Sequence, residues 1–177
     1  KTAYEIGVRL VGSEMCIRDR CDYLHMNPGN KRTLEELKAR ISAHHVRKNL
    51  SRTRLAVLGR HPDGFHTCAY DAEELKRLAG VTVDQLEMKV LFEEAQQVPQ
   101  STLKTLRKEL EPKIEGLENV NREPLAKSLK ILSALRKKAQ SEGYHGFSVR
   151  CWPEFFTEYG CAACGAMELL NRDGIAT

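Results

Sequence analysis

Two cysteines near the end of the chain have the spacing of a metal site. Cys161 and Cys164 are separated by two residues and followed by Gly165. Such a pair places two thiolates on one tight turn, and zinc takes four sulfur or nitrogen ligands. Cys151 and His145 lie close enough in the sequence to complete the set. The sequence therefore indicates a candidate zinc site made of Cys161, Cys164, Cys151 and His145.

Three alternatives to this local site stay open. His66 and Cys68 would supply the second pair of ligands if they fold against the first. The missing ligands could also follow Thr177. Finally, residues 161–171 are rich in small side chains, so the segment is equally compatible with a helix that buries both thiols.

A second group of side chains is suited to phosphate. Seven cations and no carboxylate lie between residues 38 and 60: Lys38, Arg40, Arg47, Lys48, Arg52, Arg54 and Arg60. Cations at this density contact a DNA or RNA backbone without reading its bases. The alternative is a solvated face whose cations offset a helix dipole.

Residues 70–86 have the pattern of two helices joined by a glycine turn. Asp71 begins a capping box, and Gly80 is expected to end the first helix in a left-handed conformation. This stretch resembles the helix-turn-helix of regulators of the mercury-resistance repressor family, which implies DNA binding. Lys76 departs from that family's small residue, and residues 83–94 carry four carboxylates against one lysine. The alternative is two core helices around a glycine turn.

The elements that position these residues are expected to be mostly helical. A capping box from Thr33 to Glu36 predicts a helix that ends near Asn49. Two β-prone runs around residues 61–64 predict a β-hairpin near 53–70. Leucine stripes over 103–117 and 125–135 predict an antiparallel helical hairpin, which would also offer a surface for self-association or a partner helix.

The composition is consistent with packed helices. Charged residues make up 29% of the chain and aromatic residues only 6%, which favours a helical bundle over a β-sandwich. No apolar run has membrane-spanning length. We find no phosphate loop, nucleophile elbow or His-Glu-x-x-His motif, so no catalytic residue is assigned and enzymatic activity is left undecided.

The first twenty residues have a separate explanation. Lys1–Glu5 and Leu10–Asp19 resemble the in-frame translation of a transposase-type sequencing adapter. This resemblance implies that residues 1–20 are an artefact to be excluded from fold reasoning. Their removal takes four cations and three carboxylates from the net charge of +4, leaving +3. We then expect the remainder to be a fragment of a longer protein.

The predicted protein is mainly α, with one short β-hairpin. Residues 21–142 are expected to form a helical domain, and residues 143–177 a separate aromatic and cysteine-containing segment. The predicted function is a nucleic-acid-associated or regulatory binding module. The alternatives are a zinc-stabilised fragment of a larger enzyme or scaffold, and a helical protein–protein interaction module. Five unpatterned cysteines in residues 21–177 favour an intracellular, cytoplasmic location.

Overall fold

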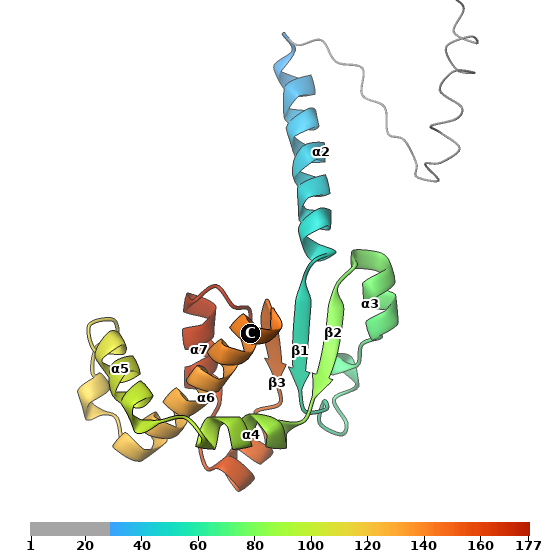
Figure 1. The fold of residues 1–177 in the computed structure, drawn as a ribbon. Coiled ribbons are helices and arrows are strands. Elements are labelled where there is room, and N and C mark those ends of the chain that lie inside the picture. Colours follow the sequence, from blue (N-terminus) through green and yellow to red (C-terminus); the bar gives the residue numbers. More distant parts are fainter. Residues whose placement is uncertain (1–28) are drawn as a thin grey trace, which may run out of the picture. The chain divides into compact units, whose positions relative to one another are not determined.

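A three-stranded parallel sheet with helices on both faces organises residues 45–177 (Figure 1). The structure is a computed structural model, and it describes residues 29–177. The chain divides into two compact units, residues 1–44 and 45–177. The predicted adapter-derived segment, residues 1–20, lies outside the described residues.

The first helix of the described residues, α2 (Lys31–Leu50), confirms the helix predicted from Thr33. It begins earlier than expected because Asn30 caps it. The Asn30 Oδ1 accepts hydrogen bonds from the backbone N–H groups of Arg32 and Thr33, at 3.0 and 3.4 Å. No residue of this helix is buried.

The sheet consists of β1 (Arg54–Leu58), β2 (Thr82–Leu86) and β3 (Gly146–Val149), in the order β2-β1-β3. Both neighbours of β1 run parallel to it. Parallel strands need a crossover, and α3 (Ala72–Ala79) provides it between β1 and β2. The other elements are α4 (Met88–Gln96), α5 (Gln100–Leu110), α6 (Arg122–Glu142), α7 (Cys164–Arg172), and the short helices η1 (His66–Cys68), η2 (Leu117–Asn119) and η3 (Phe155–Tyr159).

The predicted β-hairpin near 53–70 is wrong. Its turn is present, because the Phe65 N–H donates to the Pro62 carbonyl at 3.1 Å and Gly64 has a φ of +84°. The chain does not return beside β1, however. The segment after the turn forms η1, and β1 pairs instead with Thr82–Leu86 from beyond α3.

The helix-turn-helix is also wrong, although its first half is confirmed. Asp71 accepts hydrogen bonds from the N–H groups of Glu73 and Glu74, and Gly80 ends α3 in the left-handed region at a φ of +78°. The expected recognition helix is the strand β2, followed by α4. Thr82 and Val83 are β-branched and pair in register with Arg54 and Leu55. Non-local pairing therefore prevails over the leucine spacing.

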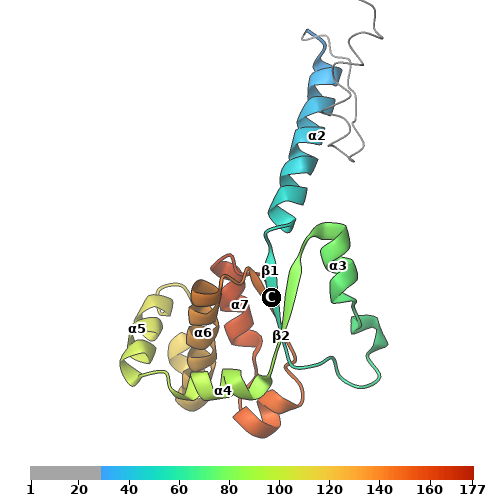
Figure 2. The ribbon, with the colours of Figure 1, turned by 45° about the vertical axis from the view of Figure 1, so that its right-hand side comes forward.

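The helical layer packs against one face of the sheet (Figure 2). Helix α6 contacts α4, α5 and α7, and it buries residues on several sides: Leu129, Ile131, Leu132, Ala134 and Leu135. The second leucine stripe is thus part of a core. Helix α5 ends at Leu110, short of the predicted 117, but Leu117 is still buried in η2.

An aromatic cluster joins η3 to this core. The ring of Phe92 on α4 stacks on Tyr159 at 5.0 Å and meets Phe155 edge-on at 5.1 Å. The Tyr159 hydroxyl donates to the Lys127 carbonyl at 3.2 Å. Burial, with a smaller contribution from nearby Cys161, raises the pKa of Tyr159 to about 12.

Residues 143–177 contribute β3, η3 and α7 to the same compact unit as residues 45–142. After α7 the chain returns to the free edge of β3. There Ala176 forms a parallel bridge with Gly146, and the Phe147 N–H donates to the Ala176 carbonyl at 2.8 Å. A side chain at Gly146 would lie 2.9 Å from that carbonyl oxygen, so the close approach requires glycine.

The fold class is therefore mixed α and β. The prediction of much helix is confirmed, but a helical bundle with a hairpin does not describe a parallel sheet crossed by helices on both faces. None of the helices in residues 29–177 is long and apolar enough to cross a bilayer.

Candidate binding site at the carboxyl ends of the strands

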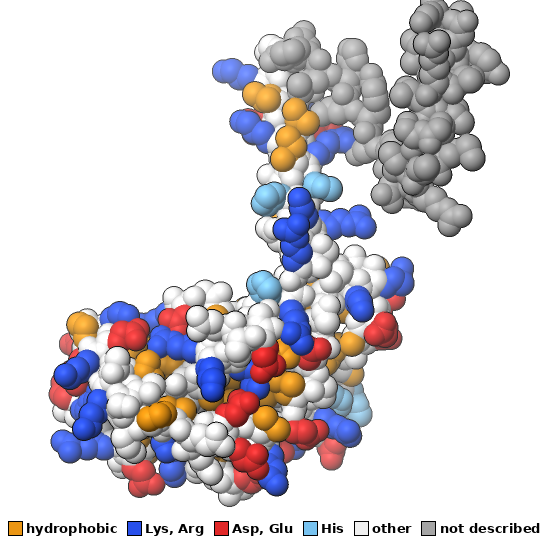
Figure 3. All heavy atoms as spheres, viewed as in Figure 1, with side chains coloured by type: hydrophobic (Ala, Val, Ile, Leu, Met, Phe, Trp, Pro, Cys, Tyr) orange, Lys and Arg blue, Asp and Glu red, His pale blue; other side chains and the backbone are white. Residues whose placement is uncertain are grey.

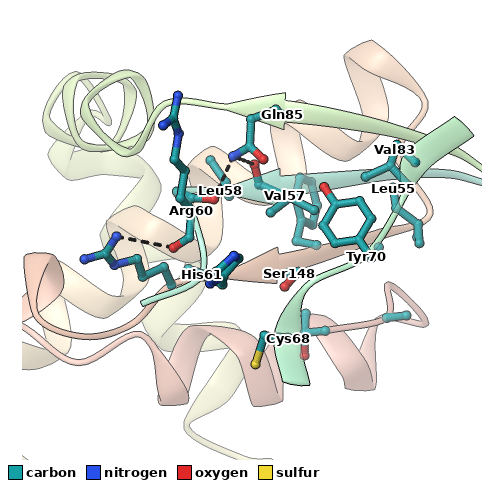
Figure 4. A pocket seen from close by; sticks show the side chains of 18 of the residues that line it. Leu55, Val57, Leu58, Arg60, His61, Cys68, Tyr70, Val83, Gln85 and Ser148 are labelled. Atoms are coloured by element: carbon teal, nitrogen blue, oxygen red, sulfur yellow. Dashed lines mark hydrogen bonds between the residues drawn. The ribbon is translucent and has the colours of Figure 1, made fainter. Parts of the chain in front are cut away.

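A cavity of about 780 Å³ lies over the sheet face opposite the helical core, and we call it the carboxyl-end cavity (Figure 4). Side chains of the three strands form its floor: Leu55, Val57, Val83, Gln85 and Ser148. Leu75 of α3 and Tyr70 contribute to its wall. The cavity extends past the ends of β1 and β3, where its charged residues lie.

Topology explains why a crevice opens at this edge. The chain leaves β1 towards α3 and the cavity face, whereas it leaves β3 towards α7 and the helical core (Figures 1 and 2). The two connections therefore diverge at the carboxyl ends of neighbouring strands. In open α/β sheets this switch point is where ligands bind.

The first cation of the cavity follows β1 directly. Gly59 turns the chain with a φ of +80°, and its N–H donates to the Leu86 carbonyl at 3.0 Å. Arg60 is exposed, and it makes no ion pair within residues 29–177. In Figure 4 its side chain extends past Gln85 at the rim of the cavity. Its charge is therefore available to a ligand.

The second cation, Arg150, is held in place. Its backbone N–H donates to the Leu58 carbonyl at 3.0 Å, which continues the β1–β3 ladder. Its guanidinium donates to the carbonyls of Arg60 and Trp152, both at 3.3 Å, and forms an ion pair with Glu154 at 3.0 Å. These contacts make Arg150 a rigid support for the loop that carries Arg60.

Polar groups that suit hydroxyls lie on the floor of the cavity and next to its cations. His61 places Nδ1 3.2 Å from the Pro62 carbonyl, and a carbonyl only accepts, so Nδ1 is the donor in this contact and Nε2 is left for a ligand hydroxyl. The Gln85 Nε2 donates to the carbonyls of Val57 and Gly59, at 3.1 and 2.6 Å. Ser148 adds a hydroxyl from β3.

The charge of this site favours an anion. Arg60 and Arg150 line the cavity, and no carboxylate does so among its described residues. Arginine binds planar or tetrahedral oxyanions through two parallel hydrogen bonds. The arrangement can hold a ligand with one anionic group, hydroxyls and an apolar face.

The residues predicted to bind zinc lie apart from this cavity. Cys161 is buried, with its thiol 3.1 Å from the Ser128 hydroxyl and donating to the Pro124 carbonyl. Cys164 and Cys151 are exposed, and the His145 Nδ1 accepts from the Arg54 N–H at 3.2 Å. Within residues 29–177 no three potential metal ligands cluster. Zinc binding by these four residues stays a prediction.

The predicted phosphate-binding cations lie on three kinds of element. Lys38 and Arg40 pair with Glu35 and Glu36 on α2, which also carries Arg47 and Lys48. Arg54 pairs with Asp84 at 2.6 Å and lies over the Tyr144 ring. Arg52 lies in the turn before β1, and Arg60 alone reaches the carboxyl-end cavity.

The face of the 45–177 unit in Figure 3 intersperses Lys and Arg with Asp and Glu side chains. A surface that binds the phosphate backbone of a nucleic acid would instead carry a cluster of positive side chains.

His61, Gln85, Ser148 and Arg150 were missed as candidate site residues by the sequence analysis. Two signals in the sequence point towards His61 and Gln85. The β-prone runs 54–58 and 82–86 flank a capped helix, which is the pattern of a β-α-β unit, and Gly59-Arg60-His61 follows the first run. Ligand residues at that position follow from the general rule for parallel sheets.

Comparison with known proteins points to an enzyme. No family model matches the chain. It is 32% identical over 151 residues to the sulfoquinovose isomerases of Priestia megaterium and Priestia aryabhattai. It is 29% identical over 159 residues to the sulfoquinovose isomerase of Clostridium sp. (strain MSTE9). These matches cover 85–90% of this chain.

The chain is similar to sulfoquinovose isomerases. It spans about a third of the length of these curated relatives, 34–36%. The similarity overturns the family predicted from residues 70–86, because the relatives are isomerases and not mercury-resistance repressors. It also overturns the nucleic-acid-associated module and fits the alternative of an enzyme fragment better. The adapter interpretation of residues 1–20 is not supported by matches that cover up to 90% of the chain.

Proposed function

We propose that this chain forms part of an isomerase that acts on sulfoquinovose, and that the carboxyl-end cavity contributes to the substrate site. The observation that carries the proposal is the similarity over 151 residues to enzymes of that name. The charge of the cavity supports it independently, since sulfoquinovose is a hexose with a sulfonate in place of one hydroxyl.

The dimensions and chemistry of the cavity are compatible with such a ligand. Its volume of about 780 Å³ falls in the range of small-molecule sites. A hexose offers hydroxyls that match His61, Gln85 and Ser148, and apolar C–H faces that match Val57 and Tyr70. A sulfonate is a strong-acid anion and keeps its negative charge throughout the neutral pH range. The arginines of the cavity therefore always meet a charged ligand.

A chimera tests the proposed function. The aligned segment of the Priestia megaterium enzyme is replaced by the matching part of this chain, and turnover of sulfoquinovose is followed by nuclear magnetic resonance. We expect the chimera to isomerise sulfoquinovose and to leave glucose unchanged. A chimera that unfolds cooperatively, like the parent enzyme, and yet lacks turnover would contradict the proposal.

The titration of the full chain alone with sulfoquinovose serves as a second measurement. It does not depend on the folding of the chimera. We expect saturable binding with shifts confined to residues of the cavity, and an absence of binding in the folded chain would count against its role in the substrate site.

A further inference from the structure

We infer that the two arginines of the carboxyl-end cavity have different tasks. Arg60 binds the sulfonate of the substrate, and Arg150 positions the loop that carries Arg60. The inference rests on the proposed function and names the part of the substrate that this end of the cavity recognises. Arg60 is then a specificity-determining residue, because it contacts the group that distinguishes sulfoquinovose from an uncharged hexose.

The difference in partners carries this assignment. The Arg150 charge is already offset by Glu154 at 3.0 Å, and two carbonyls take further donors of its guanidinium. Because the Arg150 guanidinium already has these partners, a bound anion would add little to its binding energy. Arg60 has no such offset within residues 29–177, so an anion at the cavity mouth meets its full charge.

The backbone connects the two residues. The Arg150 Nη1 donates to the Arg60 carbonyl at 3.3 Å, across 90 positions of sequence. This bond, together with the Gly59 N–H to Leu86 bond, fixes where the Arg60 side chain begins. The side chain itself is exposed and lies beside Gln85 in Figure 4, and in this assignment it turns onto a bound ligand.

The orientation of the sugar follows from the positions of the remaining groups. Arg60 and Arg150 lie beyond the ends of β1 and β3, whereas Val57 and Ser148 lie on the strands. A bound sulfonate at the strand ends places the sugar ring over Val57, within reach of His61 and Ser148. The neutral hydroxyls then meet neutral partners, and the sulfonate meets the cations.

Affinity measurements on the full chain test the inference. Sulfoquinovose, glucose 6-phosphate and glucose are titrated into the wild-type chain and into Arg60→Gln, which removes the charge and keeps polar contacts. We expect Arg60→Gln to weaken sulfoquinovose binding roughly tenfold to hundredfold, the range for a lost charge-assisted hydrogen bond, and to leave glucose unchanged. Arg60→Lys should retain part of the affinity, since lysine keeps the charge without the planar fork.

Two further variants separate the tasks of the arginines. Arg150→Gln should weaken sulfoquinovose and glucose alike, because it releases the loop that shapes the whole cavity mouth. Arg52→Gln is the matched control, since Arg52 is an exposed arginine before the amino end of β1 and outside the cavity. It should bind all three sugars as the wild type does.

The outcomes distinguish this inference from the proposed function. Equal losses of glucose and sulfoquinovose affinity in Arg60→Gln would overturn the inference. It would also be overturned if the wild-type chain bound glucose 6-phosphate more tightly than sulfoquinovose. An active chimera whose KM for sulfoquinovose is unchanged by Arg60→Gln would also overturn it, while the proposed function stands. An inactive chimera together with Arg60-dependent sulfoquinovose binding by the chain would retain the sulfonate site and reject the isomerase.

Discussion

The two faces of the sheet differ in how completely they are covered. On the core face, Ala56 and Leu58 of β1 are 0% and 1% exposed and lie in the same cluster as α4 and α6. On the cavity face, Leu55 and Val57 of the same strand are only half-buried, and α3 has no buried residue.

The contrast separates stability from binding. Burial of apolar surface is the main favourable term in folding, so the core face supplies most of the stability of this unit. The cavity face gives up part of that burial and leaves room for a ligand against a floor held rigid from the other side. We therefore expect substitutions on the two faces to have effects of different kinds.

The largest expected effect is in the core on the helical side of the sheet. Leu91 of α4 is fully buried, and Leu91→Ala should lower the free energy of unfolding by about 2–5 kcal/mol, because it leaves a cavity in a packed core. Leu75→Ala on α3 is the matched change at the carboxyl-end cavity and should cost about 1 kcal/mol. Urea denaturation measures both, and equal losses would contradict the difference between the faces.

The turn between α3 and β2 should be the next most sensitive. Gly80 has a φ of +78°, and a methyl group there would lie 2.7 Å from the Ser51 Cα and Cβ. Gly80→Ala should therefore cost about 2–3 kcal/mol. Gly116→Ala is the control, since it has a φ of +79° with nothing within 4 Å, and should cost about 1 kcal/mol. A Gly80→Ala variant as stable as Gly116→Ala would exclude the close contact.

Alkaline pH should lower the free energy of unfolding through ionisation of Tyr159, which lies in the core. Its pKa is about 12 in the folded chain against 10 for an ordinary tyrosine, so the unfolded state loses the proton first. The stabilisation is complete below pH 10 and is lost as the pH rises towards 12, by about 2 kcal/mol. Denaturation at a series of pH values should show a flatter decline for Tyr159→Phe. Parallel curves for the two proteins would show that Tyr159 does not cause the loss.

The smallest effect on stability should come from the cavity mouth. Arg60 is exposed and has no ion pair in the described part of the chain, so Arg60→Gln should change the free energy of unfolding by less than about 0.5 kcal/mol. A melting temperature equal to that of the wild type checks this. A clear loss of stability would assign Arg60 to the fold instead of to a ligand.

Local signals in the sequence predicted both ends of α3 correctly, because Asp71 and Gly80 cap it as expected. Gly143 ends α6 by the same left-handed geometry, at a φ of +73°. These features depend on the backbone of a few consecutive residues, so a short stretch of sequence is enough to specify them. The same holds for the turn at Pro62–Gly64, which forms without the hairpin that it suggested.

The pairing of the strands did not follow from such signals. Val83 and Leu86 have spacing that suits a helix, and only the partner strand 28 positions earlier decides for β2. Arg60 is likewise one of seven cations in one basic run of the sequence, whereas the fold separates it from Arg54, which is paired with Asp84.

The sequence by itself determined how α3 begins and ends and which side chains are apolar enough to form a core, because capping and burial depend on residue type and short spacing. Only the tertiary structure brought Arg60 and Arg150 to one edge of the sheet. Parallel strands meet through crossovers of many residues, so the position of a ligand site between two strand ends depends on strand order, which a local pattern does not encode.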